Sequence, residues 1–337
     1  MIDIIIPTYN QKELLRRCVQ SVRANTSTAY MITVADDNSP EPGFKQLLKE
    51  IGVNVVYNKG EQGFPVNCNS AVRETCNEFI CLLNSDTRVC VGWLEAMVAE
   101  MQDRDVGIVG ARLLYPKDGS ARGGRIQHAG VARNHRGEPY HIFRYADANS
   151  PDVTMRREIN AVTFACALIR RQLWDEQGGL DEGFVGGQFE DVSFCFSARK
   201  AGWKIVYQPQ AMVYHMEHGS GEDFVAKTAG PNKQRFMEMW PDMGSDEHLF
   251  KPVSWRKMHD PQAIEALAAI LHEFRGESLC YVLNKQTKEH YEHCRRLDDM
   301  KYGKLPEVEK ITVREWAKEI LKRMSTLVDA EETRNHV

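Results

Sequence analysis

The stretch LLNSDTRV, residues 82–89, ends an apolar run in a small turn that carries a carboxylate. Asp86 follows Asn84 and Ser85 directly after residues typical of a buried strand. Mg²⁺ or Mn²⁺ bound to a nucleotide diphosphate needs only one or two protein carboxylates, because phosphate oxygens and water supply the other ligands. Asp86 is therefore a candidate metal ligand. The alternative is an aspartate that caps the following turn.

Two further acidic pairs occupy positions where they could do chemistry. Asp36 and Asp37, in VADDNSP, follow another apolar strand and could accept hydrogen bonds from a nucleobase or a ribose. An Asx turn is the alternative. Glu190 and Asp191, in FEDVSFCF, stand at a predicted helix start, where a carboxylate is stabilised as an anion. They either stabilise the helix end or provide a general base, which must be ionised to take a proton from an acceptor hydroxyl.

Histidines follow a strand later in the chain. VYHMEHGSG, residues 213–221, offers His215 and His218. An HxxH spacing can also bind zinc, but the chain contains neither an HExxH motif nor a CxxC pair. A single imidazole beside Asp86 suits a manganese-type ion better.

These polar turns follow the strands of an alternating pattern in the first 110 residues. The pattern predicts strands at 2–7, 30–36, 53–57, 78–83 and 106–111, and helices at 11–22, 44–51, 64–76 and 92–102. Repeated β-α-β units predict a mostly parallel sheet covered by helices on both faces. Ligands bind such sheets beyond the carboxyl ends of the strands. The loops PTYN, DDNSP, NKGEQG and NSDT should therefore converge on one crevice.

The pattern changes twice farther along the chain. Residues 112–157 are rich in Gly, Arg, His and Asn, which predicts long loops over the sheet edge. Order returns at 159–171, followed by a helix near 190–202 and strands at 203–208 and 211–215. Beyond about 250 the chain is helical, with helix starts at Asp260 and at the capping box Thr312–Glu315.

Composition narrows the class of protein. The net charge of −4 gives no general attraction to nucleic acids or anionic membranes. The opening MIDIIIPTYN lacks a basic segment before its apolar run, so we expect no signal peptide, and no apolar run approaches the length of a membrane span. The 9 cysteines are scattered, which is typical of reduced thiols in a cytosolic protein. We therefore expect a cytoplasmic location.

Together these motifs resemble the inverting glycosyltransferases of family 2 with the GT-A fold, and they are most similar to the O-antigen and rhamnosyltransferase-like branch. That branch makes bacterial surface polysaccharides. The motifs occur in family order within residues 1–225: IPTYN, VADDNSP, NKGEQGFPVNCNSAV, LLNSDT, GGLDEGF, FEDVSFCFSARKAGW and YHMEHGSG. The resemblance implies a Rossmann-like, mostly parallel α/β sheet flanked by helices. Its nucleotide-sugar-binding half would span 1–110, its acceptor-binding and catalytic half 111–250, and a helical C-terminal extension 251–337.

The resemblance also implies a role for each matching position. Asp191 would be the catalytic base, with Glu190 beside it holding the acceptor. Asp86 and His215 would bind Mn²⁺ or Mg²⁺, and the donor would be a UDP- or dTDP-linked sugar. The donor-binding positions would be Pro7, Thr8, Tyr9, Asn10, Asp36, Asp37, Asn58, Gly63, Asn67, Asn84 and Ser85.

Two positions depart from the family pattern. Asn84 replaces the first acid of the DxD-type motif, so metal binding rests on fewer charges. Gly221 and Glu222 replace the basic residue usual after the serine of HGSG, so phosphate contacts there are in doubt.

Several alternatives remain at this point. The acceptor hydroxyl would belong to a saccharide, including a lipid-linked glycan, or to a modified DNA base or a protein; a DNA acceptor predicts a basic groove beside Asp191. A binding or scaffolding protein without activity is another alternative. A nucleotidyltransferase is disfavoured because PTYNQKELLRR contains no glycine for a phosphate loop. Arg314, Lys318 and Lys322 lie beside an apolar helical stripe. This helix suits either peripheral contact with the inner membrane face or packing against the catalytic domain or a second subunit.

Overall fold

The computed structural model describes residues 1–59, 63–134, 137–217 and 222–241. Its contacts divide the chain into two units, Met1–Glu247 and His248–Val337. The second unit lies outside the described residues. The predicted extension from 251 onward, its helix near Arg314 and any membrane or subunit contact through it therefore stay predictions.

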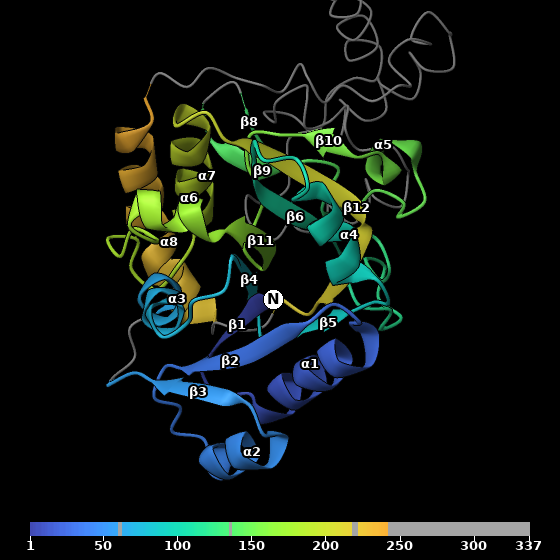
Figure 1. The fold of residues 1–337 in the computed structure, drawn as a ribbon. Helices are drawn as coiled ribbons and strands as arrows, with labels where there is room; N and C mark the ends of the chain where they lie inside the picture. Colours follow the sequence, from blue (N-terminus) through green and yellow to red (C-terminus); the bar gives the residue numbers. More distant parts are fainter. Residues whose placement is uncertain (60–62, 135–136, 218–221, 242–337) are drawn as a thin grey trace, which may run out of the picture. The chain divides into compact units, whose positions relative to one another are not determined.

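The centre of the first unit is a 10-stranded sheet of order β10-β12-β6-β11-β4-β1-β2-β3, with β5 paired to β12 and β7 paired to β6 (Figure 1). Its first four strands are mutually parallel, and they are β1 (Ile2–Thr8), β2 (Tyr30–Asp36), β3 (Asn54–Tyr57) and β4 (Phe79–Leu83). Their carboxyl ends therefore share one edge. Backbone hydrogen bonds join the loops there, from Asp37 N to Thr8 O at 2.9 Å and from Asn58 N to Asp36 O at 2.9 Å.

The second half of the sheet is mixed. It contains β5 (Thr87–Val89), β6 (Val106–Leu114), β7 (Ile126–His128), β10 (Arg157–Glu158), β11 (Cys166–Arg170) and β12 (Lys204–His215). Strand β11 is antiparallel to both of its neighbours, β4 and β6, whereas β12 is parallel to β6. The predicted mostly parallel α/β sheet is thus confirmed, with antiparallel additions in the second half.

Helices cover both faces of the sheet (Figure 1). They are α1 (Lys12–Asn25), α2 (Phe44–Ile51), α3 (Phe64–Arg73), α4 (Trp93–Glu100), α5 (Pro151–Thr154), α6 (Arg171–Gln177), α7 (Glu190–Lys200) and α8 (Glu222–Met239). Alternate side chains of a strand point to one face. Ile2, Ile4 and Ile6 of β1 accordingly share a buried core with Leu15 and Val19 of α1. None of the described helices is long and apolar enough to cross a membrane.

Two expectations about the second half were wrong. Residues 112–157 are not simply loops: β6 extends to Leu114, and β7, α5 and β10 follow, with a separate two-stranded sheet of β8 (Val131–Arg133) and β9 (Pro139–His141). Strands β7, β8, β9 and β10 have only two or three residues each, too few to show a periodicity. Residues 203–208 and 211–215 form one strand, β12, whose register shifts between Gln208 and Met212.

Candidate active site

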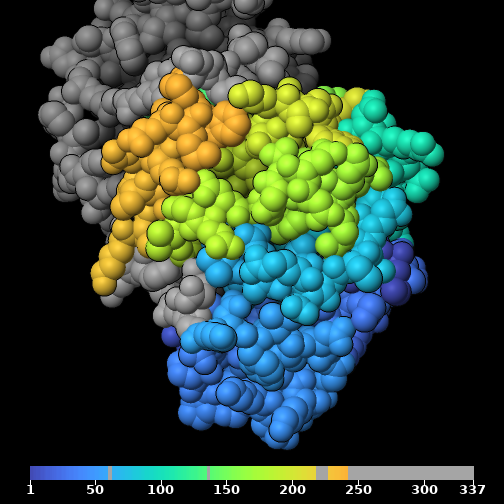
Figure 2. Space-filling model, turned by 60° about the vertical axis from the view of Figure 1, so that its left-hand side comes forward, coloured from blue at the N-terminus to red at the C-terminus, as the bar shows by residue number. Residues whose placement is uncertain are grey.

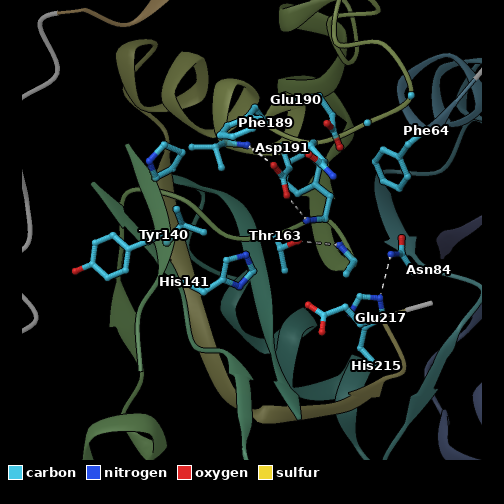
Figure 3. A pocket seen from close by; sticks show the side chains of 18 of the residues that line it. Phe64, Asn84, Tyr140, His141, Thr163, Phe189, Glu190, Asp191, His215 and Glu217 are labelled. Atoms are coloured by element: carbon cyan, nitrogen blue, oxygen red, sulfur yellow. Dashed lines mark hydrogen bonds between the residues drawn. The ribbon is translucent and has the colours of Figure 1, made fainter. Parts of the chain in front are cut away.

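A cavity of about 490 Å³ lies where the two halves of the sheet meet. Its walls come from the turn after β4, the β8–β9 hairpin, the segment before β11, the start of α7 and the end of β12. Figure 3 shows Glu190 and Asp191 on one side, Asn84 and His215 on the other, and Thr163 between them. The cavity therefore holds the predicted base and one predicted metal ligand together.

Asp191 accepts hydrogen bonds on both of its carboxyl oxygens. Its Oδ1 accepts from Val192 N at 2.8 Å and its Oδ2 from Phe164 N at 3.2 Å. Burial raises the pKa of Asp191 above its ordinary value, and these backbone donors and the Thr163 hydroxyl oppose part of that rise. Phe164 and Thr163 precede β11, so the strand that lies antiparallel in the sheet orients the carboxylate at the first turn of α7.

Glu190 has the opposite environment. It is 5% exposed, and its Oε2 is buried without a hydrogen-bond partner among the residues that the structure describes. Burial, and then the charge of Asp191, raise the pKa of Glu190 well above its ordinary value of 4.5. Burial thus raises the pKa of both carboxyl groups, but only Asp191 accepts hydrogen bonds from neighbouring backbone and side-chain donors, which favour its anion. Of the two, Asp191 is the better placed to act as the base.

Asp86 and His215 come together through β5. This short strand pairs antiparallel with β12, with Thr87 opposite His215. As a result His215 Nε2 lies 3.1 Å from Asp86 Oδ1, and Asn84 Nδ2 lies 3.3 Å from the same imidazole nitrogen. Asp86 is 3% exposed and does not itself line the cavity, so His215 and Asn84 form the cavity wall of this cluster.

Gln127 of β7 fixes the orientation of His215. Its Oε1 lies 2.7 Å from His215 Nδ1, and its Nε2 donates to His215 O at 3.3 Å. An amide oxygen only accepts, so His215 donates from Nδ1 to Gln127, and its Nε2 is directed at Asp86 and Asn84. This is the arrangement that a histidine needs to bind a metal through Nε2.

The chemistry of these side chains fits Mn²⁺ or Mg²⁺. His215 Nε2 and Asp86 Oδ1 lie 3.1 Å apart, and Asn84 Oδ1 is buried without a partner within the described part of the chain. A cation between them would satisfy all three groups. The described residues contain no cluster of three or more His, Cys, Asp or Glu side chains that could hold a metal alone. A cation held here would need further ligands, such as phosphate oxygens or water.

Four predicted donor-binding residues form one hydrogen-bonded network at the ends of β2 and β3. Asp37 Oδ2 accepts from Gly63 N at 2.8 Å and its Oδ1 from Asn58 Nδ2 at 3.3 Å. Asn58 also donates to Asn67 Oδ1 at 2.7 Å, and Asn67 donates to Ala35 O at 2.8 Å. The network adjoins the cavity because Phe64, which follows Gly63, lines it.

Apart from Asn84, the other predicted donor residues lie at neighbouring strand ends and do not line the cavity. Asn10 joins the loops after β1 and β2, because its N donates to Ser39 Oγ at 2.7 Å and its Oδ1 accepts from Glu41 N at 3.0 Å. Asp36 is fully buried, and its Oδ1 accepts from Ser39 N at 3.0 Å, so this carboxylate stabilises the loop after β2. The remaining positions are Pro7 and Thr8, which are buried, and Tyr9 and Ser85, which are half-buried.

With this geometry established, comparison with known proteins decides the family. Residues 3–176 match the family described as Glycosyl transferase family 2. The chain belongs to glycosyl transferase family 2. The match covers just over half of the sequence and includes the network around Asp37 and the turn that carries Asp86, whereas Asp191 and His215 lie beyond it.

Individual relatives agree with the family. The chain is 32% identical over 231 residues to the uncharacterized protein y4gI of Sinorhizobium fredii, covering 65% of this chain and 25% of that protein. It is 29% identical over 230 residues to the O-antigen biosynthesis protein RfbC of Myxococcus xanthus, covering 65% of this chain and 17% of that protein. The chain thus spans a quarter or less of the length of these two relatives.

A solved structure agrees with the fold. The crystal structure of GalNAc-T7 with UDP, GalNAc and Mn²⁺ superposes with a TM-score of 0.59 at 17% identity, covering 91% of this chain and 59% of that one. At this identity the likeness concerns the fold alone, and it supports the GT-A architecture that the sequence motifs predicted.

Three residues that line the cavity were not predicted as site residues from the sequence. Arg144 lines the cavity and pairs with Glu217, whose Oε1 lies 2.7 Å from its Nη2. His141, from β9, also lines the cavity. Both Arg144 and His141 lie in the stretch without periodicity, where no motif singled them out. Glu217 stands inside the motif YHMEHGSG, and its place two residues after His215 was the one available signal.

Proposed function

We propose that this protein is an inverting, metal-dependent glycosyltransferase that moves a sugar from a nucleotide-diphosphate donor to a hydroxyl group of a saccharide. One observation carries the proposal: Asp191 shares a cavity of about 490 Å³ with the Asn84–His215 wall, behind which Asp86 lies. A base on one side and a diphosphate site on the other are what a single displacement requires.

In the proposed reaction the Asp191 carboxylate accepts the proton of the acceptor hydroxyl. The hydroxyl oxygen forms a bond to the anomeric carbon, and the bond from that carbon to the diphosphate oxygen breaks with its electron pair leaving on the diphosphate. Attack and departure occur on opposite faces of the sugar, so the configuration inverts. Glu190, beside Asp191, forms a hydrogen bond with the acceptor and orients it. General-base catalysis of this kind contributes about 10²–10⁴-fold in rate.

Asp86 and His215 are the residues that would hold the cation, and Gln127 keeps His215 in the required tautomer. When bound, Mn²⁺ or Mg²⁺ neutralises charge that develops on the leaving diphosphate. Arg144 adds to this neutralisation. It is the one Lys or Arg side chain among the described residues that line the cavity, and it stands in for the basic residue missing after HGSG.

The charge of the cavity favours a neutral acceptor. Asp191 and Glu217 are acidic, and Arg144 is already paired with Glu217. Burial lowers the pKa of His141 to about 3, so this histidine adds no positive charge. A DNA acceptor requires a basic groove to bind its phosphates, and the described lining beside Asp191 has none. A saccharide, which offers neutral hydroxyl groups, fits better, and the likeness to an O-antigen biosynthesis protein supports the same class.

A screen of nucleotide sugars tests the proposal. UDP-, dTDP- and GDP-linked sugars are added with and without Mn²⁺, and thermal unfolding is followed. A ligand that binds only the folded state adds about 2.7 kcal/mol to the free energy of unfolding at one hundred times its Kd, and it thereby raises the thermal midpoint. We expect one nucleotide class to give a Mn²⁺-dependent shift. The donor selected is then incubated with oligosaccharide acceptors, and the absence of both a shift and transfer across the panel would reject the function.

A further inference from the structure

The loop that leads into α7 has an unusual backbone. Gly186, Gly187, Gln188 and Phe189 all have positive φ, at 77°, 126°, 78° and 71°. Residues other than glycine adopt this region at a cost, and such conformations persist only where surrounding contacts impose them. Glu190 and Asp191 follow immediately, so whatever holds the loop also sets the direction in which these two carboxyl groups point.

One set of contacts comes from the donor-side network. Gly63 and Gly186 form an isolated parallel bridge, and Phe64 N donates to Gly186 O at 3.1 Å. The two backbones are so close that a Cβ added to Gly63 would lie 2.4 Å from Gly186 Cα. Gly63 N also donates to Asp37, so the loop touches the network predicted to bind the nucleoside.

The other set comes from α8. Asn232 is 2% exposed, and its Nδ2 donates to Val185 O at 3.0 Å and to Gly187 O at 2.6 Å. One turn farther along the helix Phe236 is fully buried, with its ring 5.6 Å from that of Phe189. Figure 2 shows α8, in orange, lying against the yellow-green surface that includes this part of the chain. Helix α8 is therefore tied to the loop by a side-chain amide and an aromatic contact.

We propose that Asn232 is a positioning residue for the catalytic pair. Its amide group uses both of its hydrogens on loop carbonyls, and it thereby holds 186–189 in the positive-φ path that turns Glu190 and Asp191 toward the cavity. Without these donors the carbonyl groups of Val185 and Gly187 lose this partner, and the loop relaxes toward ordinary φ values. We call the two hydrogen bonds from Asn232 to the loop the clamp. Its effect on catalysis rests on the proposed function, whereas the clamp itself does not.

The test uses Asn232→Asp, which keeps the side-chain shape but replaces the two donors by an acceptor. Asn232→Ala serves as a second, neutral variant in case the aspartate prevents folding. The matched control is Gln234→Ala, which removes an exposed amide from the same helix; that amide bonds Glu238 rather than the loop. Amide hydrogen exchange is followed over 183–192 in the full chain without ligand. UDP binding with Mn²⁺ and turnover of the donor selected by the screen are measured in parallel.

We expect faster exchange confined to 183–192 in both Asn232 variants, and a kcat lower by about 10²-fold, because small misplacements of reacting groups cost about that much. UDP affinity and donor KM should stay close to wild type, and Gln234→Ala should change nothing. Exchange at the loop equal to that of Gln234→Ala would overturn the clamp, and so would an equal loss of UDP binding and kcat. If the wild-type protein turns over no donor, the proposed function fails, while hydrogen exchange still decides the clamp.

Discussion

Replacing Asp191 with asparagine separates the proposed chemistry from the structure that surrounds it. Asparagine keeps the shape of the side chain and one acceptor oxygen but cannot take a proton at neutral pH. In the folded protein the carboxylate receives hydrogen bonds from Val192 N and Phe164 N on its two different oxygens. The variant therefore retains one of these acceptors and turns an NH₂ group toward the other donor.

Two magnitudes follow. Loss of a general base costs about 10²–10⁴ in rate, which at about 1.36 kcal/mol per factor of ten is about 2.7–5.4 kcal/mol of transition-state stabilisation. The unmatched donor costs about 1–3 kcal/mol of folding stability, and removing a buried charge beside Glu190 offsets part of that cost. Catalysis should therefore fall by much more than the stability of the fold.

The assay compares kcat, donor affinity and thermal midpoint for Asp191→Asn and for Asp105→Asn. The second variant makes the same chemical change at an exposed aspartate that pairs with Lys204, and it should behave as wild type. Donor affinity should stay within about threefold of wild type, which corresponds to a difference of under about 1 kcal/mol in binding free energy between the wild-type and Asp191→Asn complexes. A variant that keeps more than about one tenth of wild-type kcat lies below the range for a general base and would refute the assignment of Asp191.

Further variants test the remaining roles. His215→Ala should raise the Mn²⁺ concentration needed for UDP binding by about 10–100-fold, as calorimetry would measure, and unchanged Mn²⁺ dependence would exclude His215 as a ligand. Glu190→Gln should alter the pH dependence of stability. The pKa of Glu190 is raised on folding, so the folded protein keeps a proton that the unfolded chain releases above about pH 4.5. The stability of the wild-type protein therefore falls as pH rises from there. Thermal midpoints of the glutamine variant should lack that decline, and parallel curves would show that Glu190 is not protonated. Arg144→Met should raise the donor KM by about tenfold or more, the worth of a charge-assisted hydrogen bond, and a KM equal to wild type would remove Arg144 from the donor site.

The first half of the sheet could be predicted closely because its signals are local. The predicted strand at 30–36 and helix at 44–51 have the bounds of β2 and α2. The parallel arrangement of β1 to β4 follows from the β-α-β pattern, and it brings the polar loops to one edge. Even so, the pattern could not distinguish Asp36 from Asp37. One stabilises the loop after β2, and the other joins the network with Gly63.

Much of the second half could not be predicted, although the helix expected near 190–202 corresponds to α7, because several of its elements are short and its contacts are distant in sequence. Strand β5 has three residues and was not predicted, yet its pairing with β12 sets the distance between Asp86 and His215. Thr163 lies just before β11, which runs antiparallel to both neighbours, and no periodicity indicates that it would reach Asp191. These contacts depend on strand order, which local composition does not encode.

The contrast has a physical consequence for how this site should be tested. The family motifs contain the groups proposed to react, but three side chains outside or at the edge of those motifs set their geometry. Gln127 fixes the tautomer of His215, Thr163 stabilises the anion of Asp191, and Asn232 holds the loop before it. Each acts across the fold on a single reacting group. Substitutions at these positions should therefore alter metal affinity, the ionisation of the base and kcat separately, while leaving the reacting groups themselves in place.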